Sequence, residues 1–84
     1  MIALKPLTHL RPGQKAFIVD MKNSQLCETL FEMGVFPGDL VEIKEISAEN
    51  QSVIVKINNH TYNIFNGAAE TIITNVVSFD ICLN

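Results

Sequence analysis

The 84-residue sequence contains no tryptophan and a single tyrosine, Tyr62. Domains that bind proline-rich helices do so in a groove lined by several aromatic side chains. One tyrosine cannot line such a groove, so the composition disfavours a domain that reads proline-rich peptides.

Basic residues are also few. Six lysines and arginines stand against nine aspartates and glutamates, which gives a formal net charge of −3. Lys5, Arg11, Lys15 and Lys22 are spaced four to seven residues apart, and Lys44 and Lys56 lie farther along the chain. Binding to nucleic acid needs a face of clustered cations that neutralises phosphates. We therefore expect no nucleic-acid partner.

Cysteine and histidine are scarce. Cys27 and Cys82 lie far apart, and His9 and His60 are the only histidines. No Cys-x-x-Cys or His-x-x-x-His spacing brings such residues together as metal ligands. No glycine-rich phosphate loop is present, and no spacing pairs a nucleophile with a base and an orienting group. The sequence predicts no catalytic residue, no metal site and no cofactor.

Long hydrophobic runs are absent as well. No run approaches the roughly 18 apolar residues of a membrane span, and residues 1–6 lack the basic start and apolar stretch of a secretion signal. We expect a cytoplasmic protein. Hydrophobic residues nevertheless make up 48% of the chain, with a mean hydropathy of +0.24. We expect a partner or a second copy to cover the surplus apolar surface.

The most informative feature that is present is the segment 30–39. Gly34 fits the position just past a helix end, where the backbone turns left-handed without penalty for glycine. Val35 is then placed to fold back onto the last helical turn. Pro37 and Gly38 suit the two corners of a type II turn. The segment predicts a helix that stops at a glycine and a turn that starts a strand.

A short helix is predicted to precede this stop. Asn23 and Ser24 are both good N-cap residues, because a short side-chain oxygen can accept a hydrogen bond from a free helix amide. Leu26, Leu30 and Met33 recur at helical spacing and form an apolar stripe. A helix of about ten residues is not stable alone, so this one must lie against a sheet.

Alternating apolar and polar residues predict the strands. The predicted strands are 14–21, 40–46, 52–57, 60–65 and 71–77, and the alternating segment 78–84 is a candidate for one more. Strict alternation in the first strand puts Asp20 on the face of Ile18 and Met21 on the opposite face. Asn58-Asn59 is predicted to be a tight hairpin turn, and 66–70 a turn or a single helical turn. Short strands at this spacing predict a small closed barrel.

The order of these motifs resembles the ferrous iron transport protein A (FeoA) family. Leu10-x-Pro12-Gly13 precedes the first strand, and Leu26-x-x-x-Leu30-x-x-Met33-Gly34-Val35-x-Pro37-Gly38 is similar to the core pattern of the family. The segment Tyr62-Asn63-Ile64-Phe65-Asn66-x-Ala68-Ala69-x-x-Ile72 resembles its closing part. The resemblance covers roughly residues 5 to 77.

This resemblance implies a mainly β fold. We expect a small SH3-like β-barrel of five to six strands, with one short α-helix inserted after the first long strand. The chain 1–84 would be a single domain with its core at about 5–77, and 78–84 would be an extra C-terminal strand or tail.

The resemblance also implies a function. We expect a non-enzymatic, cytoplasmic accessory protein of bacterial ferrous iron uptake. Its partner would be the cytoplasmic GTP-binding domain of a membrane ferrous-iron permease, whose transport it would modulate, without insertion of this chain into the membrane. The residues predicted to bind this partner are Met33, Val35, Phe36, Pro37 and Phe65.

Two alternative functions stay open at this stage. One is direct binding of ferrous iron or another transition metal, which requires His9 or His60 to converge with carboxylates. The other is an SH3-like homo-oligomeric interaction module of divergent role, in which the C-terminal strand 78–84 pairs between chains.

Overall fold

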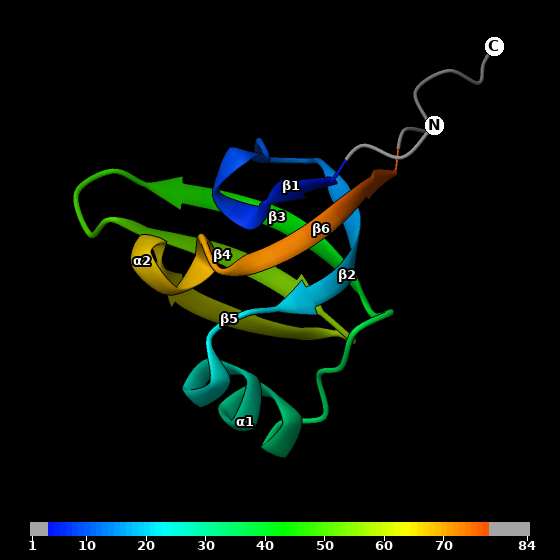
Figure 1. The fold of residues 1–84 in the computed structure, drawn as a ribbon. Helices are drawn as coiled ribbons and strands as arrows, with labels where there is room; N and C mark the ends of the chain where they lie inside the picture. The colour runs from blue at the N-terminus through cyan, green and yellow to red at the C-terminus, as the bar shows by residue number, and fades with distance from the viewer. Residues whose placement is uncertain (1–3, 78–84) are drawn as a thin grey trace, which may run out of the picture.

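The computed structural model describes residues 4–77, which form one mainly antiparallel β fold with a short α-helix after the first long strand (Figure 1). This part of the prediction is confirmed. The elements in chain order are β1 (Leu4–Pro6), the 3-10 turn η1 (Leu7–His9), β2 (Lys15–Met21), α1 (Ser24–Glu32), β3 (Leu40–Ser47), β4 (Ser52–Ile57), β5 (His60–Phe65), α2 (Asn66–Ala69) and β6 (Ile72–Val77). The predicted strand at 78–84 lies outside the described residues.

The strands form one six-stranded sheet within residues 4–77, in the order β1-β6-β2-β3-β4-β5. Every neighbouring pair is antiparallel. The predicted closure is wrong for this part of the chain, because β1 and β5 stand at the two ends of the order and are not hydrogen-bonded to each other. The sheet curls without closing, and the strand at one end of the order, β1, has only three residues. In Figure 1, α1 lies below β5, and α2 lies above β5 next to the start of β6.

The core lies inside the curled sheet. Val41, Ile43 and Val55 from the central strands are completely buried, with 0% of their surface exposed. Leu7 of η1 and Ala69 of α2 are buried with them. The predicted single helical turn after β5 is thus confirmed, and it contributes a small side chain to the core.

A β-bulge changes the facing of residues in β2. The pairing of β2 with β6 shifts register between Ile18 and Asp20. As a result Met21 is buried and Asp20 is exposed, whereas strict alternation predicted Asp20 on the face of Ile18. The extra residue of the bulge lets β2 avoid the burial of a carboxylate.

A long-range hydrogen bond holds β1 to β6. Leu4 lies opposite Asn75 in this ladder. The side chain of Thr74 is completely buried, and its hydroxyl donates to the carbonyl oxygen of Lys5 at 2.8 Å. A buried hydroxyl must be hydrogen-bonded to avoid a desolvation penalty, so this bond fixes the first strand of the described fold on the last.

The hairpin of β4 and β5 has the predicted tight turn. Asn58 and Asn59 have φ values of 53° and 69°, the left-handed pair that two-residue hairpin turns require.

Neither helix of residues 4–77 is long and apolar enough to cross a membrane.

Candidate docking surface

Helix α1 has a defined start. The side-chain oxygen of Asn23 accepts a hydrogen bond from the amide of Leu26 at 3.0 Å. Of the two predicted N-cap residues, Asn23 is the cap and Ser24 is the first helical residue. This bond satisfies one of the free amides at the helix start.

The end of α1 is fixed as firmly. Gly34 has φ of +87°, and its amide donates to the carbonyl oxygen of Phe31 at 3.0 Å. The amide of Val35 donates to the carbonyl oxygen of Leu30 at 2.8 Å. These two bonds form a Schellman motif, which terminates a helix at a left-handed glycine. The predicted glycine stop is confirmed.

The second Pro-Gly turn is attached to the sheet. Gly38 has φ of +101°, and Asp39 donates its amide to the carbonyl oxygen of Phe36 at 3.1 Å. The carboxylate of Asp39 accepts from the amide of Phe36 at 2.9 Å and from the side chain of Asn58 at 3.2 Å. Ile18 of β2 donates to the carbonyl oxygen of Asp39 at 2.9 Å. The connection after α1 is therefore a rigid corner.

Large apolar side chains are exposed around this helix and corner. Met33 at the helix end is 52% exposed, Phe36 at the corner is 48% exposed, and Phe65 at the end of β5 is 72% exposed. The rings of Phe31 and Phe36 pack together with centroids 5.0 Å apart, within the range for an attractive aromatic pair. Single exposed apolar residues are ordinary, but a gathering of them indicates an interaction site.

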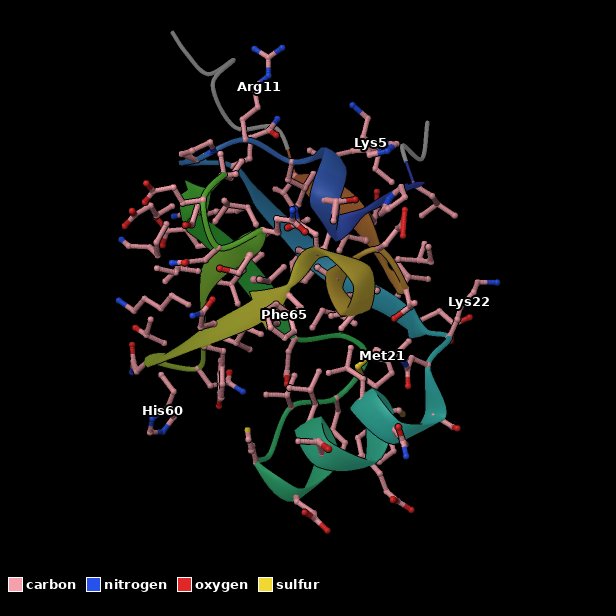
Figure 2. The ribbon with its side chains drawn as sticks, turned by 90° about the vertical axis from the view of Figure 1, so that its left-hand side faces the viewer. Lys5, Arg11, Met21, Lys22, His60 and Phe65 are labelled. Carbon is pink, nitrogen blue, oxygen red and sulfur yellow. The ribbon has the colours of Figure 1, made fainter. Side chains whose placement is uncertain are left out.

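A groove of about 430 Å³ runs between α1 and β5. Phe65 lies beside it, above α1 in the view of Figure 2. Within the described part of the chain, no charged side chain lines the groove, whose lining residues are Leu26, Thr29, Leu30, Met33, Thr61, Tyr62, Asn63, Ile64, Phe65 and Ala68.

The structure divides the five residues that the sequence predicted for partner binding. Met33 and Phe65 line the groove together. Phe36 does not line it and packs on Phe31 instead, while Pro37 is exposed at the corner. Val35 is completely buried, so its side chain holds the helix end in the core and offers no surface to a partner.

Sequence reasoning missed the contribution of β5 to this surface. Thr61, Tyr62 and Asn63 line the groove opposite α1, although nearly 30 residues separate them from the helix. The available signal was a six-residue strand with neither lysine nor proline, directly after a tight turn. Such a strand has no device that protects a sheet edge.

The two histidines do not build a metal site in the described part of the chain. His9 lies in η1 and His60 at the hairpin end of β5, and both are exposed. Figure 2 shows His60 at the periphery of the fold. Among residues 4–77, no group of three or more His, Cys, Asp or Glu side chains is arranged to hold a metal ion.

The arrangement of a curled sheet, one capped helix and a glycine-proline corner matches a known family. The model of the FeoA domain family matches residues 5–75. The chain belongs to the FeoA family. This membership confirms the SH3-like fold that the sequence predicted and supports a part in ferrous iron transport.

Solved structures agree with this assignment. Iron(II) transport protein A from Clostridium thermocellum is 32% identical, with a TM-score of 0.77, over 86% of this chain and 45% of that chain. An iron uptake regulatory protein (FeoA) is 23% identical, with a TM-score of 0.76, over 89% of this chain and 99% of that chain. No curated protein matches the chain.

The same fold also occurs within regulators of transcription. A manganese-dependent transcriptional repressor is similar over 92% of this chain and 44% of that chain, with a TM-score of 0.81 and 14% identity. At this identity the likeness concerns the fold alone. A shared fold does not establish a shared function.

Proposed function

We propose that this FeoA-family chain is a non-enzymatic accessory protein of ferrous iron uptake in the cytoplasm. It binds the cytoplasmic GTP-binding domain of a membrane ferrous-iron permease and modulates transport. Four residues from the predicted set carry the contact: Met33, Phe36, Pro37 and Phe65. The observation on which this proposal rests is the gathering of exposed apolar side chains on a rigid helix end and corner.

The chemistry of these side chains supports a protein partner. Aromatic residues and methionine are enriched in the cores of protein interfaces, where charged residues are depleted. Phe36 is held in place because its amide is bound by Asp39 at 2.9 Å and its ring packs on Phe31. A side chain that is ordered before binding loses little conformational freedom on association. Phe36 is therefore the proposed anchor residue of the interface.

The proposal is tested by titration of the full chain onto the purified cytoplasmic domain of the permease from the same organism, with and without guanine nucleotide. Calorimetry or fluorescence anisotropy measures the dissociation constant. An anchor residue contributes enough that Phe36→Ala weakens binding by about tenfold or more.

Ile46→Ala is the matched control for this experiment. Ile46 is 44% exposed near the end of β3, outside the groove and the corner, so its truncation leaves binding unchanged. Absence of binding at high micromolar concentration in every nucleotide state contradicts the proposal, as does equal loss of binding in the two variants.

A further inference from the structure

β5 is an edge strand of the sheet that residues 4–77 form. Asn66 donates its amide to the carbonyl oxygen of Gln51 at 2.8 Å, on the side of β4. Amides in an antiparallel strand point alternately to the two sides. The amides and carbonyls of Thr61, Asn63 and Phe65 therefore point away from β4, toward the edge of the sheet, where no strand of residues 4–77 pairs with them.

This edge and the groove define what can bind there. An occupant must supply backbone donors and acceptors along a strand of six residues, about 20 Å long. It must also supply apolar side chains on one face, since Leu26, Leu30 and Met33 line the helix side of the groove. An uncharged groove gives no compensation for the burial of a charge. An extended segment with alternating apolar residues meets all three conditions.

The sequence itself contains such a segment. Residues 78–84, which lie outside the described structure, read Ser-Phe-Asp-Ile-Cys-Leu-Asn. Phe79, Ile81 and Leu83 fall on one face of an extended chain, and the one charged residue, Asp80, falls on the other. Seven extended residues span about 23 Å, enough to cover the length of β5.

The position of Val77 favours binding to a second molecule. The β2–β6 ladder ends with Lys15 opposite Val77, and β2 begins at Lys15. β6 starts next to α2, which directly follows β5, and runs away from it toward Val77 (Figure 1). Val77, after which residues 78–84 follow in the sequence, therefore lies at the end of β6 that is remote from the groove of the same molecule.

We propose that residues 78–84 of one chain add as a strand to the outer edge of β5 in a second copy. Phe79, Ile81 and Leu83 then lie in the groove between α1 and β5. Reciprocal exchange of two tails fills both grooves and produces a closed dimer with two-fold symmetry. This inference does not depend on the permease proposal, but both interfaces use Met33 and Phe65, so the dimer and the permease compete for these two residues.

Sedimentation equilibrium of the full chain over a range of concentrations tests the proposal. The expected result is a reversible association from one chain of 9.4 kDa to two. Ile81→Asp places a charge in the uncharged groove and weakens the dimer by about tenfold or more. Asp80→Ser is the matched control, because Asp80 lies on the opposite face of the tail, and its dimer is unchanged.

A second variant tests the edge itself. Asn63→Pro removes an amide that points outward and leaves the β4 side intact, so it weakens the dimer while circular dichroism and melting show a retained fold. A chain that stays monomeric at about 1 mM overturns the proposal. So does a dimer that persists in both Ile81→Asp and Asn63→Pro.

Phe36→Ala separates this interface from the permease contact. Phe36 does not line the groove, so this variant retains the dimer whether or not it binds the permease. Loss of the dimer in Phe36→Ala and not in Ile81→Asp would assign self-association to the corner and would refute the exchange of tails.

Discussion

The two edges of the sheet differ in how well they are protected. β1 has three residues, among them Lys5 and Pro6, and short length, lysine and proline all discourage pairing with another chain. β5 has six residues, contains neither lysine nor proline, and ends at the exposed Phe65. The sequence of β1 therefore protects that edge against pairing, whereas β5 is an unprotected edge beside an apolar groove.

This difference indicates that β5, and not β1, is the edge of the sheet suited to contact with another chain. Protein edges that pair with nothing are usually protected against aggregation, so an unprotected edge next to an uncharged groove indicates a surface that is covered in use. Helix α1 forms one side of this groove. Asn23 at its start and Gly34 after its end fix the bounds of the helix. Substitutions in β5, at the two ends of α1 and in β1 test this difference.

The largest effect is expected from proline in β5 at a position whose amide points to β4. Tyr62 lies opposite Val55, and alternation directs its amide inward. Tyr62→Pro leaves a buried acceptor without its donor, so we expect the free energy of unfolding to fall by about 2–4 kcal/mol. Urea denaturation measures this change. Tyr62→Ala measures how much of the loss in the free energy of unfolding comes from removal of the tyrosine side chain.

Asn63→Pro is the comparison that gives this result its meaning. Its amide points to the free edge, so we expect a loss well below that of Tyr62→Pro. Equal losses in the two proline variants, after correction for Tyr62→Ala, would show that the outer side of β5 is already paired.

The next effect concerns the end of α1. Gly34 has φ of +87°, and a Cβ atom added there meets open space. Gly34→Ala therefore costs only the left-handed backbone conformation, about 1–2 kcal/mol of the free energy of unfolding. Gly67→Ala, at a glycine without positive φ in α2, should leave stability unchanged or raise it slightly. Thermal or urea unfolding compares the stability of the two variants. An equal change in the free energy of unfolding would contradict the role of Gly34 as the left-handed residue that ends α1.

Removal of the helix N-cap has a smaller effect. Asn23→Ala loses the bond to the amide of Leu26 at 3.0 Å, which lowers the free energy of unfolding by about 1 kcal/mol. Hydrogen exchange should show faster opening of the first turn of α1. Ser24→Ala serves as the control, since Ser24 is exposed and is not the cap. A larger loss in Ser24→Ala would place the cap one residue later.

The smallest effect on stability is expected at β1. Lys5 is exposed, so Lys5→Val changes the free energy of unfolding by less than about 0.5 kcal/mol. Loss of the lysine nevertheless weakens the protection of this edge, and light scattering at high concentration should show increased association. Lys44→Val, at an exposed position on the central strand β3, is the control. Identical association of the two variants would show that Lys5 does not guard the edge.

Local structure could be predicted because single residues determine it. Gly34 and Gly38 have the positive φ values that their places in the chain required. Asn58 and Asn59 form the tight turn, because asparagine tolerates the left-handed conformation that this turn needs. The family resemblance was carried by these same local signals, which explains why the fold was predicted well.

Long-range structure was harder to predict. Strict alternation from Ile18 predicted that Asp20, and not Met21, would face the core. The burial of Met21 depends on the bulge in the pairing of β2 with β6, and the residues of β6 lie far along the chain. The open sheet has the three-residue β1 at one end of its strand order, and periodicity over so few residues does not reveal such a strand. The groove joins α1 to β5, and no local pattern reports which helix face lies against which strand.

The pairing of β1 with β6 has a consequence for how evolution can use this fold. Because the hydroxyl of Thr74 binds the carbonyl of Lys5, the polypeptide enters and leaves the described structure at adjacent strands. A unit with neighbouring entry and exit points can be spliced into, or appended to, a longer protein without strain on its sheet. The occurrence of similar folds as portions of much longer chains is the outcome that this geometry permits.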